Sequence, residues 1–200
     1  GKTFALQILE ETAFESGFAT CRTEIDATEN RLSNPHHIYR DLIRNLKLPG
    51  CREHGALALA SKACDLLDQK GKRTGQERMD WLEERLGCFP ISWLLSDPEI
   101  LEKPKLLGLL EADPNCPSRL ARTLHAVVPP QKGRQWAVFR YGSQGDFAGL
   151  VISGIGRLLR LLGYKGLLLV MDEMEKWFAL DWKEQSRAGN LVGGLIWGAT

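Results

Sequence analysis

Hydrophobic positions along this chain recur mostly at helical spacing, but in one place they run together. Five consecutive apolar residues, 167–171, follow Gly166 and are followed by Asp172 and Glu173. An apolar run of this length without helical periodicity is typical of a strand that is buried on both faces of a parallel sheet. Residues 18–26 alternate instead, with polar side chains on one face. They predict a second strand that lies nearer the edge of the sheet.

Three segments around these strands have the 3–4 spacing of amphipathic helices. The first covers residues 4–16 and is predicted to turn Ala5, Ile8, Leu9 and Ala13 inward, with Glu10, Glu11 and Glu15 opposite. The second starts at Asn34-Pro35, an N-cap followed by proline in the first turn, and continues to Leu46. In the third, Asp146 is predicted to cap a helix that ends at Gly163.

Residues 51–130 carry helical patterns and no strand signal, and Pro129-Pro130 closes them. They predict a helical insertion between two parts of one core, residues 1–50 and 131–200. Within the insertion, Trp81 and Trp93 are interpreted as core residues. The alternation of strands and helices outside it predicts an α/β fold, a parallel sheet with helices on its faces.

The amino-acid composition and the net charge exclude only a few classes of protein. The 200 residues hold 26 basic and 25 acidic side chains, a net charge of +1, so the charge balance gives no sign of a nucleic-acid surface. Five widely spaced cysteines without a C-x-x-C pair indicate reduced thiols in a cytoplasmic protein. The sequence has no signal peptide and no apolar run long enough to span a membrane. Gly1 in place of Met and an apolar end at Thr200 predict a piece cut from a longer protein.

Two short motifs carry the candidate chemistry. Gly1-Lys2-Thr3 opens the first helix and matches the tail of the phosphate loop G-x-x-x-x-G-K-[ST]. The pair Asp172-Glu173 ends the apolar strand, where ligands of open α/β sheets bind. Together they predict a site for ATP and Mg²⁺ that uses both ends of the chain.

The predicted roles follow from charge. Lys2 would bind the β- and γ-phosphates, while Thr3 and Asp172 would hold Mg²⁺. Glu173 would orient the attacking water as the catalytic residue. The simpler interpretations are a frayed terminus for Lys2 and Thr3, a helix cap for Asp172 and a solvated carboxylate for Glu173.

With these motifs in place, the chain resembles the P-loop ATP-binding proteins of bacteriophage-exclusion (BREX) defence systems, which are related to AAA-type and origin-recognition ATPases. Gly1-Lys2-Thr3, Gly17-Phe18, residues 38–42 and residues 161–175 carry the resemblance. It implies a P-loop NTPase sheet of order 5-1-4-3-2, here truncated at both ends. It also implies ATP and ADP as ligands and protein partners in a defence complex. DNA contact and an oligomeric state are left open.

Three functions are compatible with these motifs and with this resemblance. The first is a Mg²⁺-dependent ATPase, which depends on Glu173 following Asp172. The second is a nucleotide switch without turnover, which signals to partners through the helical insertion. The third is a structural helical module whose phosphate loop has decayed. The sequence further predicts that residues 167–171 expose a strand edge in the isolated chain, which would then aggregate or remain partly molten.

Overall fold

The computed structural model describes residues 1–26, 31–113 and 144–198. The predicted boundary at Pro129-Pro130 and the last part of the predicted insertion lie outside these residues. Two groups of elements make up the described structure. The α/β part contains α1 (Lys2–Glu15), β1 (Ala19–Glu24), α2 (Pro35–Arg44), α8 (Gln144–Leu161), β2 (Leu167–Asp172), the 3₁₀ helix η3 (Met174–Ala179) and α9 (Trp182–Gly198). The helical part contains α3 (Gly55–Gln69), α4 (Gly75–Leu86), α5 (Phe89–Ser96), the 3₁₀ helix η1 (Ile100–Glu102) and α6 (Pro104–Leu110).

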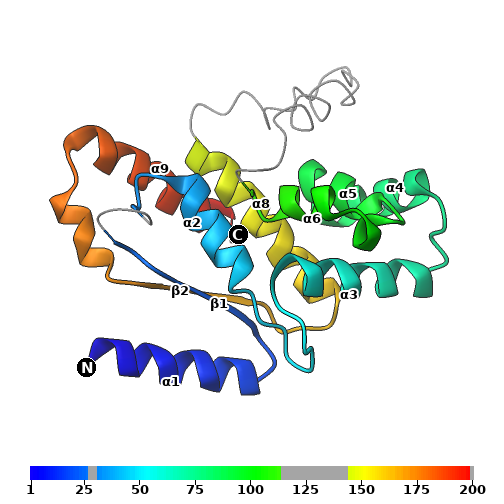
Figure 1. Ribbon diagram of the computed structural model, residues 1–200, viewed down its shortest axis with the longest axis horizontal. Helices are drawn as coiled ribbons and strands as arrows, with labels where there is room; N and C mark the ends of the chain where they lie inside the picture. Colours follow the sequence, from blue (N-terminus) through cyan, green and yellow to red (C-terminus); the bar gives the residue numbers. More distant parts are fainter. Residues whose placement is uncertain (27–30, 114–143, 199–200) are drawn as a thin grey trace.

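The two strands form a parallel pair between layers of helices. The register runs from Ala19 opposite Leu167 to Glu24 opposite Asp172. Helix α1 lies on one side of the strands, and α2, α8 and α9 lie on the other (Figure 1). Because α1 runs back along the strands, its first residue lies at their carboxyl ends.

The burial of the two strands differs from the prediction. In β2 only Val170 and Asp172 are buried, and the other four residues are partly exposed. In β1 four of six residues are buried, including Thr20 and Thr23. The reason lies at the strand edges: Thr20 exchanges two backbone hydrogen bonds with Lys47, of 2.8 and 3.1 Å, which covers the outer edge of β1. In the described sheet, β2 has β1 as its one neighbouring strand.

Helix α1 also presents a different face from the predicted one. Ile8 and Leu9 are exposed, and Glu10, which was expected in solvent, is the buried residue of the helix. The Glu10 carboxylate accepts a hydrogen bond of 3.1 Å from Lys47 Nζ. This ion pair compensates the cost of burying the carboxylate. The prediction failed because spacing alone does not show which side of a helix meets a charged partner.

Helix α8 packs closely against α9 and joins the two parts of the molecule. A methyl group on Gly149 of α8 would lie 2.4 Å from the Gly194 backbone of α9, so the two helices touch through their main chains. Arg157 of α8 donates a hydrogen bond of 2.6 Å to the carbonyl of Leu86 at the end of α4. The structure describes this helix from Gln144, so Asp146 lies inside it and is not the N-cap that the sequence predicted. Asp146 alone does not mark the boundary, because acidic residues are also favoured in the first turn of a helix.

The helical part follows the local rules of helix formation closely. Thr74 and Glu77 form a complete capping box at the start of α4, and Gly87 ends that helix in the left-handed conformation. Arg78 is buried and donates to the Lys72 carbonyl and to the Asp68 carboxylate. Apolar residues of α3, α4 and α5 fill the space between the helices.

Candidate functional site

The start of α1 and the residues after β2 meet at the carboxyl end of the sheet. Lys2 Nζ lies 3.2 Å from Glu175 Oε1, although the two residues are 173 positions apart. Their side chains are 82% and 53% exposed, so the pair lies open to solvent. The N-terminus and η3 are accordingly found at the same end of the molecule (Figure 1). A hydrogen bond from its own backbone N–H, followed by the hydrogen bond and charge of Lys2, lowers the pKa of the Glu175 carboxyl.

Asp172 is the buried member of the acidic run, with a side chain only 8% exposed. Its Oδ2 accepts a hydrogen bond of 2.7 Å from Arg22 of β1, and its Oδ1 accepts one of 2.9 Å from the backbone N–H of Glu173. A carboxylate can accept about four hydrogen bonds, so each oxygen keeps a lone pair for another ligand. Asp172 therefore has one cationic partner and unused hydrogen-bond acceptor capacity.

Glu173 adopts a backbone conformation that few residues other than glycine tolerate. Its φ is 62° and its ψ is 29°, in the left-handed region. Such strain is stored most often at functional sites, where it orients a side chain. The Glu173 carboxylate is partly exposed and lies 3.5 Å from Lys176 Nζ. The turn thus directs the two neighbouring acids of the chain to different partners.

Gly1 and Thr3 complete the N-terminal side of this site. Gly1 is the N-cap of α1, and Thr3 lies in the first turn with an exposed side chain. The first N–H groups of a helix have no partner within it and carry the positive end of the helix dipole. With Lys2 beside them, they form a combination of backbone and side-chain donors suited to a phosphate group.

The structure gathers Lys2, Asp172 and Glu173 at one end of the sheet and adds two residues that the sequence analysis did not single out. Glu175 is the acid that Lys2 contacts, and Arg22 is the cation that contacts Asp172. Glu175 was visible as part of the run Asp-Glu-Met-Glu. Arg22 could be found only with the register of β1 against β2, which no local pattern gives.

A nucleotide with Mg²⁺ fits the donors present here better than a metal held by protein ligands alone. Among residues 1–26, 31–113 and 144–198, no group of three or more His, Cys, Asp or Glu side chains could hold a metal ion. Mg²⁺ bound with a nucleotide needs only one or two protein oxygens, because phosphate oxygens and water supply the others. The exposed Thr3 hydroxyl and the Asp172 carboxylate are oxygen donors of the required kind.

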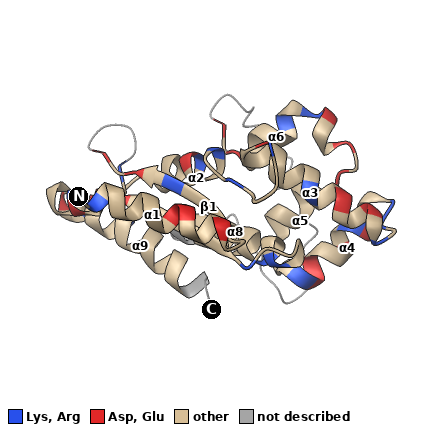
Figure 2. Ribbon diagram, turned by 90° about the horizontal axis from the view of Figure 1, so that it is seen from below, with Lys and Arg blue, Asp and Glu red and all other residues tan. Residues whose placement is uncertain are grey.

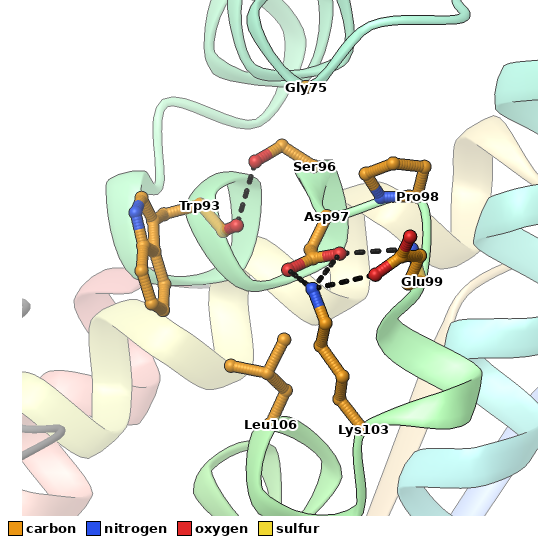
Figure 3. A pocket seen from close by; sticks show the side chains of 8 residues that line it. All are labelled: Gly75, Trp93, Ser96, Asp97, Pro98, Glu99, Lys103 and Leu106. Atoms are coloured by element: carbon orange, nitrogen blue, oxygen red, sulfur yellow. Dashed lines mark hydrogen bonds and ion pairs between the residues drawn. The ribbon is translucent and has the colours of Figure 1, made fainter.

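A cavity of about 390 Å³ in the helical part offers a second place for a ligand (Figure 3). Lys103 lies at its wall between Asp97 and Glu99, with contacts of 2.8 and 3.2 Å, and Trp93 and Leu106 face it. Burial alone would raise the pKa of Asp97, but hydrogen bonds from Lys103 and the Glu99 N–H outweigh it and lower that pKa. The charged side chains that line this cavity already form ion pairs with one another, so they offer few charged groups to a ligand.

Acidic and basic side chains are interspersed over the described elements (Figure 2). They do not gather into one basic field of the kind that attracts nucleic acids. Within the part of the chain that the structure describes, none of the helices combines the length and the apolar character needed to cross a bilayer.

Comparison with known proteins gives one match, which falls on the N-terminal side of this site. Residues 1–62 match the family model described as BREX system ATP-binding protein BrxC/D. No curated protein and no solved structure matches the chain. The match contains Gly1-Lys2-Thr3, α1, β1 and α2, and the chain is similar to this family over those residues.

Proposed function

We propose that this chain binds ATP together with Mg²⁺ at the carboxyl end of the β1–β2 sheet and hydrolyses it. The observation that carries the proposal is the meeting of two distant segments there. The helix that starts with Gly1-Lys2-Thr3 reaches the acidic run after β2, through the contact between Lys2 and Glu175. The match of residues 1–62 to an ATP-binding family supports the same reading independently.

Each residue has a role that its position allows. The Lys2 ammonium leaves Glu175 and binds the β- and γ-phosphate oxygens, since an exposed ion pair in water is weak and easily exchanged. Thr3 and Asp172 would hold Mg²⁺, which would supply positive charge beside the phosphates. Glu173 orients and polarises the attacking water in line with the γ-phosphoryl group.

The fold that we propose for this site is a P-loop NTPase sheet of order 5-1-4-3-2. In that order the strand after the first helix is the direct neighbour of the strand that ends in Asp-Glu. The parallel pairing of β1 with β2 meets this requirement. The order also places a further strand on the other side of β2, and the partial exposure of β2 supports this.

A second candidate function is a nucleotide switch that signals through the helical part without rapid turnover. One network favours it: Glu10 of α1 contacts Lys47, and Lys47 bridges Thr20 of β1 to His54 at the start of α3. A shift of α1 would therefore act on Lys47, which contacts the residue that precedes α3. In either function, we propose that other proteins of a defence complex read the nucleotide state.

The test measures binding and turnover separately in the full-length protein. Lys2→Ala is expected to weaken binding of a fluorescent ATP analogue at least a hundredfold, while Lys70→Ala, an exposed lysine in the helical part, leaves it unchanged. Glu173→Gln is expected to bind ATP normally and to lose turnover. If Lys2→Ala and wild type bind the ATP analogue equally well, the proposed nucleotide site is wrong. If the wild-type protein binds ATP normally but releases only one phosphate per protein and retains ADP, the result would instead favour the nucleotide switch.

A further inference from the structure

Arg22 contacts the carboxylate that is proposed to hold the metal ion. Its guanidinium lies 2.7 Å from Asp172 Oδ2. Arg22 is paired with Val170 in the sheet register, and Glu24 is paired with Asp172. Paired residues of neighbouring strands point to the same face, so Arg22 reaches diagonally along one face of the sheet to Asp172. The contact therefore depends on the backbone register and not on a chance meeting of long side chains.

The environment makes this pair a strong one. The side chains of Arg22 and Asp172 are only 22% and 8% exposed, so little water screens their charges. A buried carboxylate without a cation would cost several kcal/mol, which is why buried charges are paired. In the structure, Arg22 is the cation that contacts Asp172.

A magnesium ion would find the same carboxylate already neutralised. The remaining lone pairs of Asp172 could coordinate the ion, but the positive charge of Arg22 opposes its approach. Arg22 also lines a cavity of about 350 Å³ outside β1, together with the carboxylates of Glu10, Glu24 and Asp41. Lys47 lines the same cavity and pairs with Glu10, and Thr23 donates to Asp41, so Glu24 is the acid toward which the guanidinium would turn from Asp172.

We propose that Arg22 and Mg²⁺ compete for Asp172, so that Arg22 sets the magnesium concentration at which the nucleotide is held. This inference rests on the proposed function, because it needs Mg²⁺ to bind at Asp172. Arg22 acts on the metal through Asp172 and is a positioning residue. Without the Asp172 contact, the Arg22 guanidinium would turn toward the outer edge of β1.

The experiment compares wild type with Arg22→Gln in the full-length protein, with a fluorescent ADP analogue as the probe and MgCl₂ as the titrant. Loss of the competing charge is expected to lower the half-saturating Mg²⁺ concentration on the order of tenfold. It is also expected to lower the melting temperature without ligand, and Mg²⁺ with ADP should raise that temperature more than in wild type. The matched control is Arg78→Gln, which removes another buried arginine from an ion pair far from the site. It should melt earlier but keep the wild-type magnesium requirement.

Arg22→Lys keeps a positive charge beside Asp172 and serves if the glutamine variant does not fold. Its half-saturating Mg²⁺ concentration is expected within about twofold of wild type, and a tenfold fall would overturn the proposal. An unchanged or higher magnesium requirement in Arg22→Gln would overturn it too. Failure of the proposed function gives a different result, in which wild type binds no ADP analogue at any Mg²⁺ concentration.

Discussion

The α/β part and the helical part use charged side chains differently. In the helical part, charged groups complete local structure: Glu77 closes a capping box, Arg78 ties α4 to α3, and Lys103 joins two acids. At the carboxyl end of the α/β part, the ion pairs of Lys2 and Asp172 instead join segments that are distant in the sequence. Glu173 has a strained backbone, and Lys2 lies in solvent beside a distant acid. Departures from local rules concentrate where a protein carries out its function, so the comparison points to the sheet edge.

Exposed apolar side chains show the same contrast. Phe4, Phe178 and Trp182 are 63%, 84% and 74% exposed, and all three belong to the elements around the sheet edge. Among the described elements of the helical part, the exposed large apolar residues are Leu57 and Leu101, both near 40%. The α/β part therefore leaves more apolar surface for further contacts.

The largest effect is expected from Gly149→Ala, which tests whether α8 and α9 hold the α/β part together. The added methyl group would overlap the Gly194 backbone, which can move only if the helices separate. We expect a loss of about 3 kcal/mol in the free energy of unfolding, measured by urea denaturation. Gly156→Ala in the same helix meets no atom within 4 Å and should be neutral or stabilising. Equal stability of the two variants would show that the close crossing of α8 and α9 is absent.

Arg78→Gln tests whether the helical part is structural. Loss of the hydrogen bonds to the Lys72 carbonyl and Asp68 is expected to cost about 2 kcal/mol of unfolding free energy. The affinity for ATP should not change, because Arg78 lies far along the molecule from Lys2. If the ATP affinity fell while the stability stayed unchanged, the ligand would bind in the helical part. The contrast between a structural helical part and a functional α/β part would then be wrong.

Glu173→Gly separates stability from function within the α/β part. Glycine adopts a φ of 62° without the strain that Glu173 bears, so the variant is expected to gain about 1 kcal/mol of stability. It should lose ATP turnover, because the water-orienting carboxylate is gone. Thermal unfolding and phosphate release on the same sample provide the measurement. If the variant is less stable than wild type, the backbone of Glu173 is not strained.

The sequence predicted the local elements well and the contacts between distant segments poorly. The inward positions of α2 and α8 follow from their spacing, because each helix packs along a single apolar stripe. The burial of Glu10 and the pairing of Arg22 with Asp172 depend on partners 37 and 150 positions away, and no local pattern encodes them. Lys2, Asp172 and Glu173 were singled out only because phosphate binding requires a recognisable short motif.

The smallest effect is a pH dependence at the cavity of the helical part. The pKa of Asp97 is lowered from its ordinary value of 3.8. A carboxyl with a lowered folded-state pKa contributes stability that is present above 3.8 and lost as the pH falls through the lower folded value. Asp97→Asn should therefore melt earlier than wild type at neutral pH, and the difference should shrink as the pH falls below 3.8. If the difference in melting temperature persists in acid, the shape of the Asp97 side chain and not its charge is the cause.

Hydrogen exchange of backbone amides tests most directly whether the two distant segments form one nucleotide site. A non-hydrolysable ATP analogue with Mg²⁺ is added to the full-length protein, and exchange is followed by mass spectrometry. We expect slower exchange in residues 2–5 and in residues 172–176 together, with no change in residues 93–106 around the cavity of the helical part. Protection confined to residues 93–106, or protection of one of the two segments without the other, would contradict the account.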